Sequence, residues 1–375
     1  MLRHYRRYWA LLSGFLLALP LVVGALAPGG KTVSSIEARS LAPAPAFPEG
    51  LAGWRNLPRQ TDAYLSDHFG MRRLFLQAYG FIMSRAPLKT GKPLVLAGSN
   101  GWMFFRGDQM IQQSAGLIRR DGQLERTADL LGTMHTLLAA RGVRLLVASP
   151  PNSATIYGDE LPLWARNRGQ RTEYDVLLDD LAARGVPAVD LRPALIAAKA
   201  EGKVYRMHDT HWTELGGVAA FNAIVRADSH PDWTLDPASV LGAPETIVSG
   251  DLARLAGTGD NLKETERLLT LPPGKREALD QDPKFVTTLA TNDRSGPTIM
   301  IIGDSFTAGF FVSMLLQHTG RVVWLHHRFC GFDWKWIDQI RPDEVWWMPT
   351  ERFIVCGKGD VRPVGLPPPV TPAQH

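Results

Sequence analysis

The stretch PTIMIIGDSFTAGF, residues 297–310, decides which fold the rest of the sequence must complete. Its apolar run ends at Gly303, Asp304 and Ser305, and a helical pattern of apolar residues follows over residues 307–320. A short apolar run bounded by a turn is typical of a strand that is buried on both faces. The order of strand, tight turn and helix therefore predicts an α/β fold with Ser305 at the carboxyl end of a strand.

Helices and strands alternate along the rest of the chain. Helical periodicity, with a glycine near the end or a threonine at the start, predicts helices at residues 122–142, 172–185 and 213–227. Short apolar runs predict further strands at residues 143–150, 186–191, 321–327 and 343–349. This alternation predicts one domain with a mostly parallel sheet and helices on both faces. The less regular residues 229–296 are expected to form an insert outside the sheet.

Ser305 occupies a position that suits a nucleophile. In open α/β sheets, functional groups gather at the carboxyl ends of the strands. At the start of the following helix, free backbone N–H groups can hold a developing oxyanion. The alternative is that Ser305 is a serine that caps the helix. A nucleophilic serine needs a base, and the base needs an acid that orients it.

The segment DTHW, residues 209–212, supplies both partners. His211 is expected to be the base and Asp209 the acid that orients it, whereas His208 is expected to take no part. The alternative is that His211 is a surface or capping histidine. Each segment strengthens the catalytic interpretation of the other, because together they supply a nucleophile and its base in one α/β chain, which its N-terminus predicts to be exported.

A metal site is a rival interpretation of the histidines. His208, Asp209 and His211, with His326 and His327 elsewhere in the chain, carry side chains that can ligate zinc. Adjacent residues rarely point at one ion, however, and the sequence contains no H-E-x-x-H motif. The sequence therefore predicts no metal ion and no cofactor.

The N-terminus predicts export. Basic residues among residues 1–8 precede the uncharged, apolar residues 9–27. A helix of ~20 apolar residues can cross a bilayer, and basic residues favour the cytoplasmic side, so the chain after residue 28 is expected to be exported behind a retained anchor. A cleaved signal peptide is the alternative, because Ala25-Leu26-Ala27 has the small-x-small form of a cleavage site.

Composition divides the exported part into three segments. Residues 28–60 are rich in proline, alanine and glycine and predict a linker, residues 61–356 predict the folded domain, and residues 357–375 predict a flexible tail. The chain is 45% hydrophobic and 21% charged, which is typical of a globular protein. Its net charge of +4 gives little support to nucleic-acid binding. Cys330 and Cys356 are expected either to pair in an oxidising compartment or to remain as two buried thiols.

The pairing of GDSF late in the chain with DTHW upstream resembles the SGNH-hydrolase-like domain of alginate O-acetyltransferases, the AlgJ/AlgX family. The likeness extends over roughly residues 60–356. Further segments resemble that family in the same order, namely LSDHFGMR near residue 65, GSNGWMFFRGD near 100, ASPPNSATIYGDELP near 150, SGDLARL near 250 and PDEVWWMPTER near 345. The resemblance implies an SGNH-like three-layer domain in which Asp209, His211 and Ser305 form a triad.

The sequence departs from ordinary SGNH hydrolases in two ways. Asp-x-His precedes the serine and is one residue shorter than the usual Asp-x-x-His, as in the acetyltransferase branch. The separate glycine and asparagine segments that usually complete the oxyanion hole are not identifiable. Asn152 and Ser153 stand where relatives often carry a lysine, and Arg352 also matches a family position, with a structural role as the alternative to substrate contact. Together with Trp212, Asn152 and Arg352 are expected to contact substrate.

The resemblance implies a periplasmic enzyme that transfers acetyl groups to an exported exopolysaccharide, alginate-like or cellulose-like, through an acetyl-serine intermediate. It also implies partners: a membrane-bound O-acyltransferase that supplies the acetyl groups, and a secretion complex in the bacterial inner membrane. One alternative is a carbohydrate acetylesterase with the same triad. The other is a non-catalytic, polysaccharide-binding subunit of a secretion complex.

Overall fold

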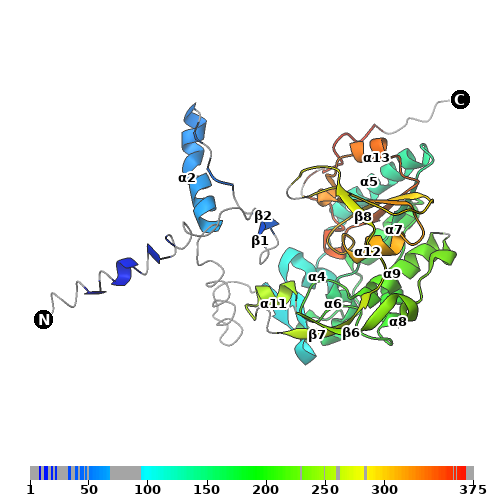
Figure 1. Ribbon diagram of the computed structural model, residues 1–375, viewed down its shortest axis with the longest axis horizontal. Helices are drawn as coiled ribbons and strands as arrows, with labels where there is room; N and C mark the ends of the chain where they lie inside the picture. The colour runs from blue at the N-terminus through cyan, green and yellow to red at the C-terminus, as the bar shows by residue number, and fades with distance from the viewer. Residues whose placement is uncertain are drawn as a thin grey trace. The chain divides into compact units, whose positions relative to one another are not determined.

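The computed structural model describes residues 94–368 except 229, 249, 259–261, 283–284, 358 and 360, together with helix α2 (Gly50–Asp67) and short pieces before it (Figure 1). The chain divides into two compact units. One comprises Met1–Lys92 and Ala253–Asn261, and the other comprises Pro93–Leu252 and Leu262–His375. The second unit contains both DTHW and GDSF.

A six-stranded sheet forms the centre of the larger unit. Its strand order is β5-β12-β10-β11-β9-β8. The first four strands in this order run parallel to one another. β9 runs antiparallel to β11, and β8 runs antiparallel to β9. The strands are β5 (Arg144–Val147), β8 (Lys275–Ala278), β9 (Thr288–Thr291), β10 (Thr298–Gly303), β11 (Arg321–His326) and β12 (Glu344–Met348). The sheet is therefore mixed, with its parallel part where the sequence predicts it.

Both faces of the sheet are covered, as the apolar run of β10 requires. Ile299 and Ile301 pack into one hydrophobic cluster, and Met300 and Ile302 pack into another. The first cluster includes side chains of α6 (Ser153–Ile156), α8, α9 and α12, and the second includes those of α5, α7 and α13. Figure 1 shows α5 and α13 on one side of the sheet and α8 and α9 on the other. The expected three-layer arrangement is confirmed.

Local sequence signals place the helices. Thr172 forms a capping box with Asp175 at the start of α7, and the Thr213 hydroxyl accepts the N–H of Gly216 at the start of α9. Gly142 and Gly185 follow α5 and α7 with positive φ, a conformation that favours glycine at a helix end. The larger helices are α4 (Met110–Ser114), α5 (Asp121–Ala139), α7 (Glu173–Ala183), α8 (Arg192–Ala198), α9 (Glu214–Ala227), α12 (Phe310–Leu315) and α13 (Lys335–Ile340).

Two predicted elements are shorter than expected. The strand predicted at residues 186–191 is reduced to a bridge between Ala188 and Val147, because Pro187 has no backbone N–H to donate. The helix predicted from residue 307 begins only at Phe310.

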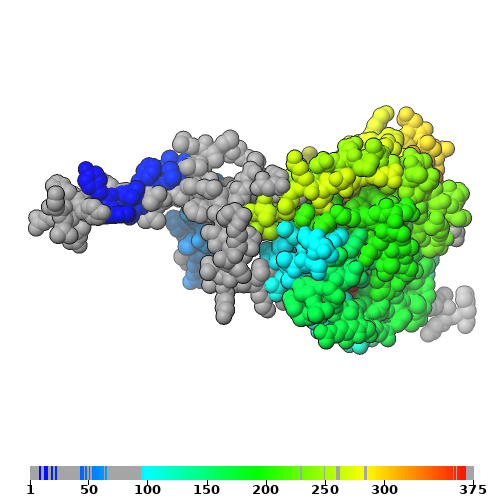
Figure 2. Space-filling view, turned by 90° about the horizontal axis from the view of Figure 1, so that it is seen from below, coloured from blue at the N-terminus to red at the C-terminus, as the bar shows by residue number. Residues whose placement is uncertain are grey.

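The insert at residues 229–296 does not lie outside the sheet. Its first half forms α10 (Pro237–Val240), β6 (Leu241–Val248), α11 (Asp251–Leu255) and β7 (Lys263–Leu269), with β6 and β7 paired as a separate hairpin. Its second half supplies β8 and β9, which extend the sheet. All four side chains of β8 are exposed, so no apolar run marks this strand in the sequence. Figure 2 shows the green surface of residues near 200 on the same face of this unit as the yellow-green surface of the β6 and β7 pair, and Arg206 forms an ion pair with Glu266 of β7.

The N-terminal predictions have mixed outcomes. Residues 9–27, the expected membrane anchor, lie mostly outside the described residues. Among the residues that are described, no helix is both long and apolar enough to span a bilayer. The expected linker at residues 28–60 is wrong in its last part, because α2 begins at Gly50. The proline-rich sequence ends there, and apolar residues then recur at helical spacing at Leu51, Trp54 and Leu57.

The tail predicted from residue 357 is also partly ordered. The N–H of Trp334 donates to the carbonyl oxygen of Val364 at 2.9 Å, and Val364 pairs with Asp333 in an isolated bridge. Pro363 is buried. The packed domain therefore continues to about this residue.

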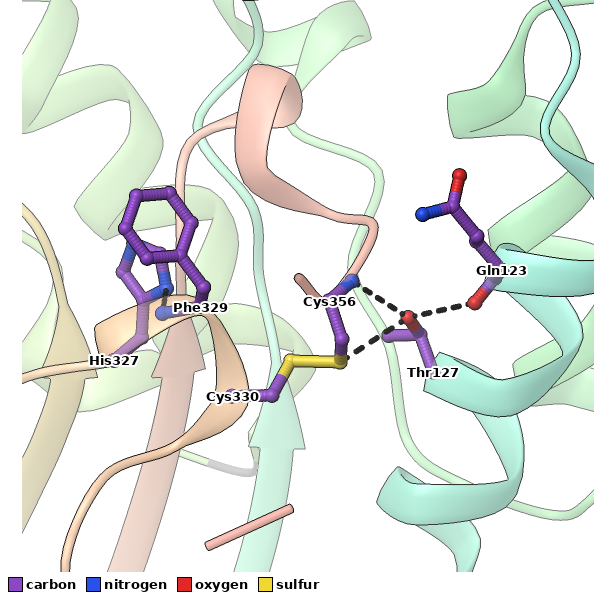
Figure 3. The surroundings of a disulfide bond; sticks show 6 residues. All are labelled: Gln123, Thr127, His327, Phe329, Cys330 and Cys356. Atoms are coloured by element: carbon purple, nitrogen blue, oxygen red, sulfur yellow. Dashed lines mark hydrogen bonds between the residues drawn. A yellow bond between two sulfur atoms is a disulfide. The ribbon is translucent and has the colours of Figure 1, made fainter. Parts of the chain in front are cut away.

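A disulfide joins Cys330 to Cys356 (Figure 3). It links the turn that follows β11 to the segment that follows β12. The N–H of Cys356 donates to the hydroxyl oxygen of Thr127 at 3.1 Å, which places α5 against the same bond. Of the two alternatives that the sequence left open, the structure contains the paired form.

Removing this disulfide is expected to destabilise the larger unit by about 3 kcal/mol, because the bond closes a loop across a sequence separation of 26 residues. Urea unfolding of the parent and of the Cys330→Ser, Cys356→Ser double variant, each with and without a reductant, measures the effect. The reductant should lower the midpoint of the parent and leave the double variant unchanged. An unchanged midpoint in parent protein whose thiols titrate as free would contradict the prediction.

Candidate active site

A narrow loop presents Asp209 and His211. Tyr205 and Trp212 pair as an antiparallel bridge at its base, and the N–H of Thr213 donates to Val204 O at 3.0 Å. The DTHW segment therefore forms one side of a hairpin-like turn that enters α9. The predicted side chains are fixed at its tip by backbone pairing on both sides.

A tight turn presents Ser305 directly after β10. The buried carboxylate of Asp304 accepts the N–H of Phe306 at 3.1 Å, and it also accepts the N–H and the hydroxyl of Thr350 at 2.8 and 2.6 Å. These bonds join the turn to the segment that follows β12. Asp304 is turned inward and Ser305 is exposed, so the turn displays the serine hydroxyl and buries its neighbour.

The two loops bring the three predicted catalytic side chains together. Ser305 Oγ lies 2.8 Å from His211 Nε2, and His211 Nδ1 lies 2.6 Å from Asp209 Oδ1, although Ser305 is 94 residues from His211 in the sequence. Both distances are those of hydrogen bonds between a nucleophile, its base and an orienting acid. With the Nδ1 proton directed at Asp209, Nε2 is the acceptor that faces the serine hydroxyl.

The environment of Asp209 keeps it ionised. Burial raises the pKa of Asp209, but the hydrogen bond and charge of His211 and the N–H groups of His211 and Asp251 outweigh burial. The pKa of Asp209 therefore lies well below its ordinary value. A carboxylate that is charged at neutral pH can stabilise the imidazolium that forms when His211 takes a proton.

Phe306 connects the triad to its surroundings. Its ring lies 4.9 Å from the His211 ring, and its carbonyl oxygen accepts the indole N–H of Trp212 at 3.1 Å. Trp212 is only 1% exposed. It holds the serine turn against the histidine loop, and its expected contact with substrate is corrected, because burial leaves no face of the indole for a ligand.

Arg352 also lies against Phe306. The centre of its guanidinium is 5.4 Å from the Phe306 ring centroid, and the side chain is partly exposed. Arg352 is therefore close to the nucleophile turn, where its positive charge can act on groups bound there.

Asn152 is fully buried, which corrects its predicted role in substrate binding. Its side-chain amide donates to Ser114 Oγ at 3.2 Å and to Gln113 Oε1 at 3.3 Å. The segment after β5 turns inward at this position, and no pattern in the sequence shows that direction. Asn152 supports the loop from within and does not face a ligand.

The structure also corrects the expected position of the oxyanion donors. Because α12 begins at Phe310, Ser305 does not lie at a helix N-terminus. The N–H groups of Phe306 and Thr307 are both directed at Asp304. The N–H of Ser305 has no acceptor among the described residues, so this donor remains available next to the nucleophile.

The other three histidines of the metal interpretation, His208, His326 and His327, lie outside the triad. His208 Nδ1 is 3.1 Å from Glu264 Oε1, on β7. His326 and His327 stack on each other, and burial lowers the pKa of His327 to about 3.

Two groups in the described part of the chain bring three potential metal ligands within 4.8 Å of one another. They are Asp209, His211 and Asp251, and Asp228, His230 and Glu344. In the first group, both ring nitrogens of His211 are already used by Asp209 and Ser305. In the second, Arg144 already supplies a positive charge to Glu344. Neither arrangement favours a metal ion over the contacts present.

Glu351 is a fully buried carboxyl group next to Arg352. Its Oε2 accepts the N–H of Asn152 and the hydroxyl of Thr155, each at 2.7 Å. Burial raises the pKa of Glu351 from 4.5 to about 7, and these two hydrogen bonds only partly oppose burial. The carboxyl group is therefore largely protonated in mildly acidic solution.

Glu351 is expected to make stability depend on pH. Because its pKa is raised in the folded state, its stabilising contribution is complete below pH 4.5 and is lost as the pH rises through about 7. For this fully buried group, the free energy of unfolding is expected to fall by about 3 kcal/mol at most over that pH range. Urea unfolding at pH 5 and pH 8 should show a smaller loss in Glu351→Gln than in the parent. Glu277→Gln, at an exposed position, is the control, and equal losses in all three proteins would contradict the prediction.

The site and its sheet correspond to a known family. Residues 95–343 match the family model described as the SGNH hydrolase-like domain of acetyltransferase AlgX. The matched residues include the loop with Asp209 and His211 and the turn with Ser305. The chain belongs to this family of SGNH hydrolase-like acetyltransferases, and the resemblance drawn from GDSF and DTHW is confirmed.

Two curated relatives are both described as probable alginate O-acetylase AlgJ. The protein of Pseudomonas aeruginosa is 27% identical over 190 residues, which are 44% of this chain and 46% of the relative. That of Pseudomonas putida is 26% identical over 177 residues, which are 46% of this chain and 43% of the relative. The chain thus matches less than half the length of these relatives. Among solved structures, the O-acetyltransferase domain of Pseudomonas putida AlgJ is similar, with 19% identity, a TM-score of 0.49, and coverage of 72% of this chain and 94% of that chain.

Proposed function

We propose that this protein is an O-acetyltransferase that adds acetyl groups to an exported exopolysaccharide, alginate-like or cellulose-like, through an acetyl group held on Ser305. The observation that carries the proposal is the hydrogen-bonded series Ser305, His211 and Asp209, with its distances of 2.8 and 2.6 Å. Membership of the acetyltransferase family supports acetyl as the group that is transferred. The AlgJ relatives support a polysaccharide acceptor.

In the first half of the reaction, the hydroxyl proton of Ser305 passes to His211 Nε2 while Ser305 Oγ attacks the acetyl carbonyl carbon of the donor. The oxyanion is held by the N–H of Ser305, and the positive charge of Arg352 lies nearby. The bond from the carbonyl carbon to the donor then breaks, and the donor leaves with the proton from His211. Ser305 remains as its acetyl ester.

In the second half, a sugar hydroxyl takes the place of the donor. Its proton passes to His211 Nε2 while its oxygen attacks the acetyl carbonyl carbon, and the proton then returns to Ser305 Oγ as the ester bond to the serine breaks. Because His211 acts as base and then as acid in each half, its orientation by Asp209 matters twice. Arg352 is our remaining candidate for contact with the acceptor.

The proposal includes a location and partners. The basic N-terminus and apolar residues 9–27 support a single span in the bacterial inner membrane, with the catalytic unit in the periplasm. The disulfide is consistent with an oxidising compartment. A periplasmic enzyme has no access to cytoplasmic acetyl donors, so we propose that a membrane-bound O-acyltransferase in a secretion complex supplies the acetyl group.

The test is a transfer assay with the full chain. The chain is incubated with an activated acetate ester, with and without an oligosaccharide of mannuronate or glucose, and both free acetate and acetylated sugar are measured by mass spectrometry. Acetylated sugar formed at the expense of free acetate is the expected result. Acetate release that no acceptor diverts would favour the esterase alternative. No turnover, and no acetyl group on Ser305, would favour the non-catalytic subunit.

A further inference from the structure

The second carboxylate oxygen of Asp209 is held from outside the catalytic loop. Oδ1 accepts the backbone N–H of His211 at 2.9 Å as well as facing His211 Nδ1. Oδ2 accepts the backbone N–H of Asp251 at 3.0 Å. One end of the carboxylate therefore faces the base, and the insert holds the other end.

The Asp251 side chain returns to the same loop. Its Oδ1 accepts the backbone N–H of Thr210 at 2.8 Å, and its Oδ2 accepts the Thr210 hydroxyl at 2.6 Å. Thr210 lies between Asp209 and His211. The two segments are thus joined by three hydrogen bonds. Thr210 donates two of them to the Asp251 side chain, and the backbone N–H of Asp251 donates the third to Asp209. Because donors lie on both segments, the bonds fix the distance between them.

Gly250 allows this close approach. A Cβ atom at position 250 would lie 1.5 Å from Asp209 Oδ2 and 2.2 Å from Asp209 Cγ. No side chain fits at such distances, so any residue other than glycine would displace the carboxylate or the backbone. The requirement is for space, since the backbone of one segment lies directly against the catalytic acid of the other.

We propose that Gly250 and Asp251 are positioning residues for the catalytic acid. They hold the Asp209 carboxylate so that Oδ1 stays in line with His211 Nδ1 while charge develops on the imidazole. The proposal rests on the proposed function and assigns a role to the SGDLARL segment, which the triad alone leaves unexplained. Neither residue touches the reacting atoms.

The test compares four variants of the full chain. Gly250→Ala displaces the carboxylate, Asp251→Ala removes both bonds to Thr210, and Thr210→Val removes one of them. Asp251→Asn keeps an acceptor for the Thr210 N–H and is the conservative variant. Asp232→Ala, at an exposed position in the same insert, is the matched control.

The expected result is a loss of kcat with little change in KM. Gly250→Ala should lose about 100-fold, in keeping with a displacement of about 1 Å at a catalytic group, and Asp251→Ala about 10-fold. Asp251→Asn should recover part of that loss. In Gly250→Ala and Asp251→Ala, the acid limb of the kcat/KM profile should move to lower pH, because a displaced Asp209 stabilises the protonated base less. Asp232→Ala should match the parent.

Three readouts separate positioning from folding and from the proposed function. Thermal unfolding identifies any variant that fails to fold. If Gly250→Ala or Asp251→Ala fails to fold, the comparison of Thr210→Val and Asp251→Asn with the parent replaces it as the test. Labelling of Ser305 by phenylmethylsulfonyl fluoride measures nucleophile activation without acetyl transfer. If the parent is not labelled at Ser305, or if the labelling does not depend on His211, the proposed function fails. If the parent is labelled, and folded variants match it in labelling rate, kcat and pH profile, the positioning role is overturned.

Discussion

Replacing Ser305 by alanine is expected to lower acetyl transfer by about 10⁴-fold or more, because the acetyl-enzyme cannot form without its oxygen. The remaining rate should equal the rate that substrate binding and the oxyanion donors provide without the serine. Acetate release and sugar acetylation are measured with the full chain, and intact-mass spectrometry shows whether one acetyl group accumulates on the protein. Peptide mapping of the parent should place that group on Ser305.

Ser239→Ala is the matched control for this prediction. Ser239 is exposed and donates to Asp236 O, so its loss leaves the triad untouched. His211→Ala should reduce the rate to a level similar to Ser305→Ala, since the two residues act as one unit, and the double variant should lose little more. Turnover that survives in Ser305→Ala would remove the serine from the mechanism and return attention to the Asp209, His211 and Asp251 group.

Replacing Asp209 by asparagine is expected to lower kcat by about 10⁴-fold while the fold persists. The amide can present an N–H group to His211 Nδ1, which favours the tautomer with the proton on Nε2. That tautomer cannot accept the proton of Ser305. Steady-state kinetics across a pH series measures the loss, and circular dichroism checks the fold.

The pH series also tests the electrostatics of Asp209. Because the pKa of Asp209 is lowered in the folded protein, the stabilisation that its negative charge provides is complete above its ordinary pKa of 3.8. This stabilisation is lost only as the pH falls through the lowered pKa. Any change in parent activity between pH 5 and 8 should therefore arise from other groups. An Asp209→Asn protein with parental kcat at pH 7 would show that the carboxylate does not orient the base.

The sequence predicts those parts of the fold and site whose determinants are local. The apolar run of β10, the capping threonines at 172 and 213 and the glycines at 142 and 185 each act within a few residues. The three triad residues also stand in short segments with distinctive chemistry. Such features can be recognised without knowing what packs against them.

The parts that the sequence does not reveal depend on distant partners. Nothing near Asp251 shows that it meets Thr210, 41 residues away, and nothing near Asp304 shows that it binds Thr350, 46 residues away. Trp212 and Asn152 have side chains that suit ligands, yet tertiary packing buries both. β9 joins the sheet by pairing with β11, and β8 pairs with β9, yet β8 carries no apolar pattern from which a strand could be predicted.

The position of β12 has a consequence for the order of folding. This strand is near the C-terminal end of the chain, but it separates β5 from β10, and β5 pairs in parallel with β12 across about 200 residues. Such a topology has high contact order, and loops of this length must close before the pairing can form. As the chain is synthesised, β5 and the helices around it must wait for the last strand of the sheet. A chain truncated before Glu344 would keep its triad residues but lack the strand that joins the two halves, so we expect it to be held by chaperones or degraded.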